Sequence, residues 1–139
     1  MSTSDSIPKD SVVVTVLVLF FAFFGGFIAA GNGFAMAWTA GDRHSSTSQL
    51  MATIVAFSIP AAITLVLSCA RPAYAILIFV LVVSPTFLML YPTADKNFKM
   101  GNRSNPLTSA IVINTIGCLS GTLLGASLGF LMKQPRSDT

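Results

Sequence analysis

The stretch LTSAIVINTIGCLSGTLLGASLGFLM, residues 107–132, decides the fold class of this chain. It contains no charged residue, and it is longer than the roughly 20 apolar residues that an α-helix needs to cross a bilayer. Gly117, Gly121, Gly125 and Gly129 recur in it at every fourth position. Residues 107–132 are therefore predicted to form a transmembrane helix with one smooth glycine face.

Uncharged runs of similar length occur three more times in the sequence. They predict transmembrane helices at residues 12–38, 49–70 and 73–91. The residues between them predict a polar loop at 41–48, a hairpin at Arg71–Pro72 and a loop at 92–106, with polar tails at 1–11 and 133–139. The predicted fold class is an all-α integral membrane protein, a single membrane domain (1–139) of four up-down antiparallel transmembrane helices with short loops.

The composition supports this class. Of the 139 residues, 53% are hydrophobic and only 9% are charged, whereas about a quarter of the residues of a soluble domain are charged. The four predicted spans leave no length for a folded domain outside the membrane. Residues 12–38 are much longer than the roughly 7–15 residues of a signal-peptide core, so we expect an uncleaved first helix.

The charged residues exclude several function classes. The net charge of +3 comes from eight Lys and Arg against five Asp, and no Glu is present. None of these charges falls inside a predicted span, so proton-coupled exporters that depend on a membrane-embedded glutamate are excluded. The basic residues are too few and too dispersed for a nucleic-acid-binding surface.

The residues that usually carry chemistry are scarce. Cys69 and Cys118 lie at different predicted depths, so a disulfide between them is not expected. His44 is the only histidine and lies in a polar loop, so neither a metal site nor a catalytic site is expected there. The chain is predicted not to be an enzyme and to hold no cofactor.

Aromatic residues and prolines refine the expected helices. Trp38 and Tyr91 mark one membrane interface and Tyr74 the other, as in an aromatic belt. Pro60 and Pro85 interrupt the second and third spans, where kinks are expected.

The charges do not decide the orientation in the membrane. Four basic residues are predicted on each side, namely Lys9, Arg71, Lys133 and Arg136 on the side of the termini and Arg43, Lys96, Lys99 and Arg103 on the other. The N-terminus and Lys9, which precede the first helix, favour cytoplasmic termini. Asn102-Arg103-Ser104 matches a glycosylation sequon, whose use the sequence does not decide.

The glycine face of residues 107–132 is a candidate helix-packing interface. Ala110 and Asn114 lie on the same face as the four glycines, because Asn114 is three residues before Gly117 and Ala110 is seven before it, and both spacings keep residues on one helix face. Bare glycines allow two backbones to approach closely, which drives helix association within lipid. The partner of this face is another helix of the same chain, a second copy or a different protein.

The first span has a similar stripe of small residues that includes Gly26, Ala29 and Gly33. Since the first and fourth helices of an up-down bundle are neighbours, their two small-residue faces are expected to close against one another. The third span has no small stripe and is large and apolar on all sides, which suits contact with lipid or with a partner's large side chains.

Two amides, Asn32 and Asn114, offer the remaining polar chemistry in the spans. An asparagine can join helices by hydrogen bonds or can line a narrow polar path. We expect Asn114 to join helices. Asn32, between Gly31 and Gly33, fits a local break in the first helix equally well.

These features favour a non-catalytic accessory or assembly subunit that packs by glycine-rich helix faces within a larger membrane complex of the respiratory or transport type. The alternative is a small homo-oligomeric channel or permeation pore for an ion or small solute, with Asn32 and Asn114 facing the path. The expected partners are membrane lipids, other membrane-protein subunits or further copies of this chain, and no nucleic acid.

Overall fold

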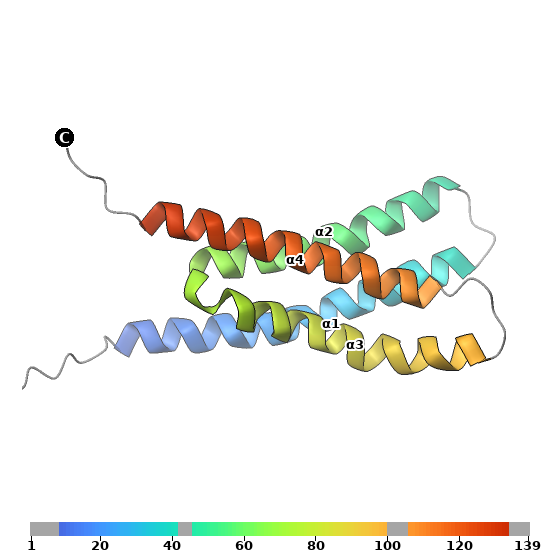
Figure 1. Ribbon diagram of the computed structural model, residues 1–139, viewed down its shortest axis with the longest axis horizontal. Helices are drawn as coiled ribbons and strands as arrows, with labels where there is room; N and C mark the ends of the chain where they lie inside the picture. The colour runs from blue at the N-terminus through green and yellow to red at the C-terminus, as the bar shows by residue number, and fades with distance from the viewer. Residues whose placement is uncertain (1–8, 42–45, 100–105, 134–139) are drawn as a thin grey trace, which may run out of the picture.

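The computed structural model describes residues 9–41, 46–99 and 106–133, and it shows an all-α membrane protein of four helices (Figure 1). The helices are α1 (Lys9–Gly41), α2 (Ser46–Ala70), α3 (Ala75–Lys99) and α4 (Pro106–Lys133). A short 3₁₀ turn, η1 (Pro72–Tyr74), joins α2 to α3. Each of the four helices is long and apolar enough to cross a membrane, so the chain is a multi-pass membrane protein.

The helices extend beyond the uncharged runs that predicted them. α3 continues to Lys99, so the first part of the predicted 92–106 loop is helical instead. Charges end an apolar run, but residues such as Ala94 and Lys96 are good helix formers and extend a helix past the hydrocarbon region. The predicted 41–48 loop is shorter than expected, because Gly41 ends α1 and residues 46–48 begin α2; residues 42–45 and most of the predicted tails lie outside the described residues.

Neither the prolines nor Asn32 interrupt a helix. α2 contains Pro60, and α3 contains Pro85 and Pro92, each within one continuous helix. α1 likewise runs unbroken through Asn32, so the local break considered there is absent. In a bilayer an unpaired backbone group costs several kcal/mol, and a continuous helix pairs nearly all of them.

The four helices form two parallel pairs. Because successive helices alternate in direction, α1 runs parallel to α3, and α2 runs parallel to α4 (Figure 1). α4 packs most extensively against α2, whereas α2 and α3, which are consecutive in the chain, contact each other least. The sequence neighbours α2 and α3 are therefore diagonal to one another, although only η1 separates them.

The α2–α4 pair fits because both helices repeat every four residues. On α2 the stripe Ala56, Pro60, Thr64 and Ser68 is buried, and on α4 the stripe Gly117, Gly121, Gly125 and Gly129 is buried. A methyl group added at Gly117 would stand 2.5 Å from the carbonyl oxygen of Phe57, and one at Gly129 would stand 2.6 Å from that of Cys69. The two backbones are thus in direct contact from one end of the glycine stripe to the other.

The α1–α3 pair uses one glycine and one proline at its centre. A methyl group at Gly26 would stand 2.8 Å from both the Pro85 side chain and the Val82 carbonyl oxygen, and 2.9 Å from the Leu81 carbonyl oxygen. Pro85 has no amide hydrogen to donate to the Leu81 carbonyl. Gly26 lets α1 approach so closely that Cα–H groups can contact these carbonyl oxygens.

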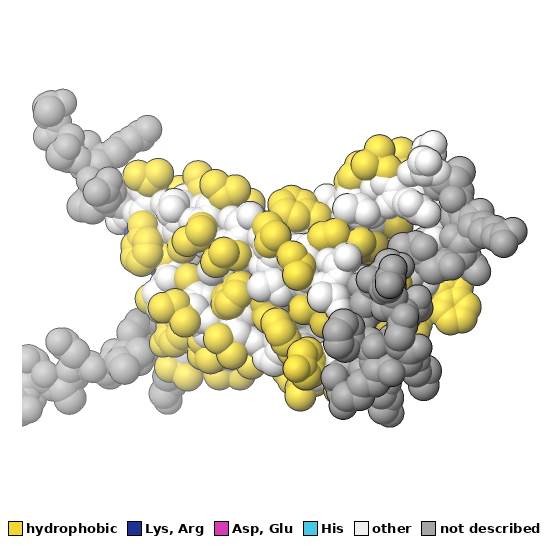
Figure 2. Space-filling model, turned by 45° about the vertical axis from the view of Figure 1, so that its right-hand side comes forward, with side chains coloured by type: hydrophobic (Ala, Val, Ile, Leu, Met, Phe, Trp, Pro, Cys, Tyr) yellow, Lys and Arg dark blue, Asp and Glu magenta, His cyan; other side chains and the backbone are white. Residues whose placement is uncertain are grey.

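The buried side chains are a mixture of small and larger apolar residues, and many large apolar side chains are exposed on the exterior. Two buried clusters fill the bundle, one containing Ala56, Leu90 and Ala110 and the other containing Ala22, Ile78 and Cys118. Hydrophobic side chains are spread over the described part of the face in Figure 2, among backbone and other side chains. Lipid tails are as apolar as these side chains, so close backbone contact, rather than exclusion of water, holds such a bundle together.

The glycine contacts make a direct stability prediction. In Gly121→Ala the added methyl group would collide with the carbonyl oxygen of Ala61 and the hydroxyl of Thr64. We expect the free energy of unfolding, measured by titration with a denaturing detergent, to fall by about 1–3 kcal/mol.

Gly31→Ala is the matched control, because nothing lies within 4 Å of a methyl group added at Gly31. Alanine is also the better helix former by roughly 0.5–1 kcal/mol. We expect unchanged or slightly higher stability for this variant. Equal losses in the two variants would show that the α2–α4 contact is not the cause.

Candidate functional site at Asn114

Asn114 lies where three helices meet. Its side chain is fully buried, and its Nδ2 group donates one hydrogen bond to the Ala29 carbonyl oxygen (3.0 Å) and one to the Thr86 Oγ1 atom (2.8 Å). Ala29 belongs to α1 and Thr86 to α3, so one amide joins α4 to the other parallel pair. Both hydrogens of the NH₂ group are used in this junction.

The other end of the amide is less well satisfied. Asn114 Oδ1 is buried and has no hydrogen-bond partner within the described part of the chain. A buried acceptor without a partner costs about 1–3 kcal/mol, which offsets part of the stabilisation from the two Nδ2 hydrogen bonds. The junction is therefore better suited to fixing which helices meet than to adding large stability.

The structure distributes the predicted packing face of α4 over two neighbours. Gly117, Gly121, Gly125 and Gly129 lie against α2 and not against the small face of α1. α1 approaches α4 at Asn114 and Ala110, on the loop side of Gly117. The physical reason is the shared four-residue period of α2 and α4, which gives carbonyl-to-glycine contacts at every turn.

The small residues of α1 contact different helices. Gly26 lies against α3, as described above, while Ala29 is buried and contributes its carbonyl oxygen to the junction. A methyl group at Gly33 would stand 3.2 Å from Leu90 Cδ1, 3.6 Å from Asn114 Nδ2 and 3.8 Å from Ala110 Cβ. The small-residue stripe of α1 thus contacts α3 at Gly26, and it contacts both α3 and α4 at Gly33.

Asn32 is separate from the junction. Its Nδ2 atom donates to the Ile28 carbonyl oxygen at 2.8 Å, one turn back in α1, and the side chain is half-buried. Asn32 and Asn114 therefore do not form a common polar path through the described bundle.

Several hydroxyl groups of the spans also donate hydrogen bonds within their own helix. Thr64, Thr115 and Thr122 each donate to the carbonyl oxygen four residues back, at 2.8, 2.7 and 2.7 Å. Such bonds satisfy the hydroxyl without any external partner. Among the described residues Ser68 differs, because its buried Oγ atom has no hydrogen-bond partner.

Sequence reasoning did not find Thr86 or the role of α2. Thr86 directly follows Pro85, and nothing in its local pattern distinguishes it from a threonine that bonds to its own helix. The role of α2 did have a signal, since Ala56, Pro60, Thr64 and Ser68 repeat with the same period as the α4 glycines.

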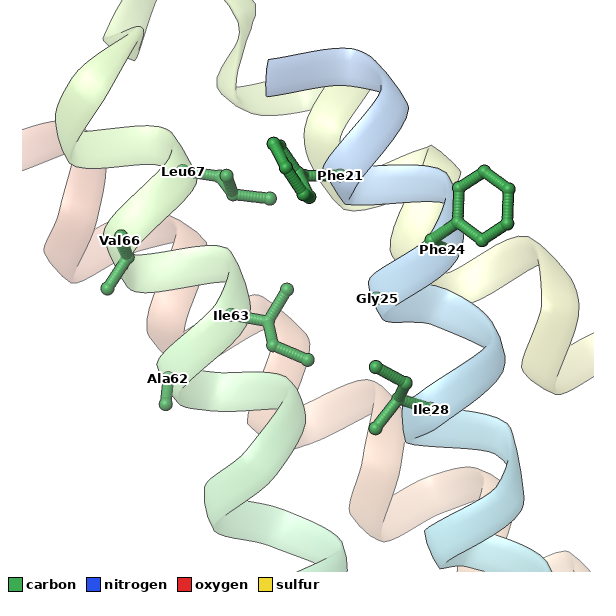
Figure 3. Close-up of a pocket in the computed structure, with 8 residues that line it drawn as sticks. All are labelled: Phe21, Phe24, Gly25, Ile28, Ala62, Ile63, Val66 and Leu67. Atoms are coloured by element: carbon green, nitrogen blue, oxygen red, sulfur yellow. The ribbon is translucent and has the colours of Figure 1, made fainter. Parts of the chain in front are cut away.

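One open groove lies between α1 and α2, with a volume of about 600 Å³. Figure 3 shows Phe21 and Leu67 facing each other across it, and Gly25 opposite Ile63. The lining side chains are all hydrocarbon, namely Phe21, Phe24, Ile28, Ala62, Ile63, Val66 and Leu67, together with Gly25. The volume falls in the range of small-ligand pockets, about 300–1,000 Å³.

Metal-ligating side chains do not cluster in the described part of the chain. No group of three His, Cys, Asp or Glu side chains comes together within residues 9–41, 46–99 and 106–133. Cys69 and Cys118 are both free thiols, as expected from their different depths. His44 and Asn102 lie outside the described residues.

The fold and the site together define a four-helix, multi-pass membrane protein whose central polar group joins its own helices. No protein-family model matches the chain, and no curated protein or solved structure matches it. Any statement about function therefore comes from the geometry of the chain itself.

The junction predicts a measurable coupling between Asn114 and Thr86. Thr86→Val keeps the shape of the side chain but removes the Oγ1 acceptor, and Asn114→Leu removes the donor. In a double-mutant cycle on the unfolding free energy we expect a coupling of about 0.6 kcal/mol, and at most about 2 kcal/mol. Additive losses would show that the two side chains do not share a hydrogen bond in the folded protein.

Proposed function

We propose that this chain is a non-catalytic accessory or assembly subunit of a larger membrane complex, of the respiratory or transport type. The observation that carries the proposal is the bonding of Asn114. The amide that a pore would need to present to a solute instead donates to Ala29 and Thr86 inside the bundle. The buried amide of Asn114 is thus engaged in joining the helices of this chain. We therefore look for the functional surface on the outside of the bundle.

The homo-oligomeric channel remains the alternative. Its candidate lining residues, Asn32 and Asn114, bond to different partners and lie in different surroundings. A pore through one copy would require the Asn114 junction to open. A pore between copies would require polar side chains on the outer surface, where the described helices carry mostly large hydrophobic ones.

The outer face of α3 is the surface that we propose for a partner subunit. Ile76 is 82% exposed and Leu88 is 74% exposed, among the highest values for large hydrophobic side chains in the chain. Leu77, Val80, Phe87 and Tyr91 extend this face along the helix. A partner helix with large side chains could interdigitate with it, and in this proposal the chain termini face the cytoplasm.

A crosslinking experiment in native membranes tests this proposal. We expect a photoreactive amino acid at Leu88 on α3 to give one discrete crosslinked product with a different membrane protein, which also copurifies in mild detergent in stoichiometric amount. The same amino acid at Leu124, on the exposed face of α4, is the matched control and should give mainly lipid adducts.

The channel alternative predicts a different set of results. The purified chain would run as a homo-oligomer, crosslinks from Leu88 would join copies of this chain, and vesicles containing it would pass an ion or small solute. Flux that changes in Asn114→Leu while assembly persists would overturn the subunit proposal.

A further inference from the structure

The groove between α1 and α2 is an open feature that the helix packing does not explain. We propose that it binds one acyl chain of a phospholipid from the leaflet on the side of the chain termini, with Arg71 near the lipid phosphate. This inference does not depend on the proposed role as a subunit.

The lining selects a hydrocarbon occupant. Its walls are aliphatic and aromatic side chains from both helices, without a polar side chain among them. A ligand held here can therefore present no polar group at this depth without losing hydrogen bonds. An acyl chain satisfies this condition along its whole length.

The middle of the groove also excludes a whole helix. A methyl group added at Gly25 would stand 2.8 Å from Ile63 Cγ2, so α1 and α2 are in close contact there. A transmembrane helix with side chains is about 10–12 Å wide and cannot enter between two helices that touch. A slender chain can lie along the line where their side chains meet.

The groove lies at the depth of the acyl-chain ends, in the part of one leaflet that is nearest to the bilayer centre. The sequence predicts that Tyr74 of η1 and Tyr91 of α3 mark opposite membrane interfaces, and the midpoint between them is at Val82 and Val83. Val82 is in contact with Gly26, which places the neighbouring Gly25 and Ile63 near the bilayer centre. Leu67 then lies about 6 Å from the centre, at 1.5 Å per helical residue, toward the side of the termini.

Arg71 supplies a cation at the correct level. Its backbone amide donates to the Leu67 carbonyl oxygen at 3.0 Å, so it continues the helical turn of α2 beyond the groove. Arg71 therefore lies at the end of α2, one turn beyond Leu67 and about 12 Å from the bilayer centre. The hydrocarbon core is about 15 Å deep on each side, so a half-buried arginine at this position can reach a lipid phosphate.

Spin-labelled phospholipids test the inference on the full chain in vesicles. The label is placed near the methyl end of the acyl chain, and electron paramagnetic resonance measures the motionally restricted lipid per protein. We expect Ala62→Phe, which fills the groove, to lower this amount by about one lipid per chain relative to the wild-type protein. Leu124→Phe, on the exposed face of α4, is the matched control and should leave it unchanged.

A second filling variant and a headgroup comparison complete the test. Val66→Phe fills the groove from the next turn of α2 and should reproduce the loss if Ala62→Phe fails to fold. Arg71→Gln should reduce the preference for phosphatidylglycerol over phosphatidylcholine several-fold, and Arg71→Lys should retain most of it. The inference is overturned if both folded filling variants keep the full amount of restricted lipid, or if they dissociate a dimer, which would identify a second copy as the occupant.

Discussion

The backbone of α4 lies directly against the backbone carbonyl groups of α2, and the rest of the bundle depends on this contact. Carbonyl oxygens of Phe57, Ala61, Leu65 and Cys69 meet Gly117, Gly121, Gly125 and Gly129 in turn. Within lipid there is no hydrophobic force between helices, so such contacts must be close and numerous to hold them together. A side chain at any of these glycines would separate the helices over the whole stripe.

This contact also decides where the other helices can lie. With α4 committed to α2, α1 pairs with α3 through Gly26 and Pro85, and the two parallel pairs meet at Asn114. Both pairs place a proline of one helix against a glycine of the other, Pro60 near Gly117 and Pro85 near Gly26. Pro85 leaves the Leu81 carbonyl group without its usual donor, and this carbonyl is one of those that Gly26 approaches, whereas the carbonyl group nearest to Gly117 is that of Phe57.

The polar side chains of the spans bond mostly inside the bundle, and apolar side chains face outward. Several hydroxyl groups, such as those of Thr64 and Thr122, bond to their own helices, and the buried amide of Asn114 bonds to two neighbouring helices. The described exterior is broadly apolar, and it includes a groove between α1 and α2. The two proposals both rest on this exterior, one on a partner subunit at α3 and the other on a lipid chain in the groove.

The sequence alone determined the four spans and the small faces, because uncharged length and glycine spacing depend only on neighbouring residues. Asn114 could be expected to join helices, since an amide in lipid needs partners. The sequence did not determine which partners, because Ala29 and Thr86 are distant in the chain and carry no local sign of the junction. Only the tertiary structure paired α4 with α2, because that choice depends on two four-residue repeats meeting in register between parallel helices.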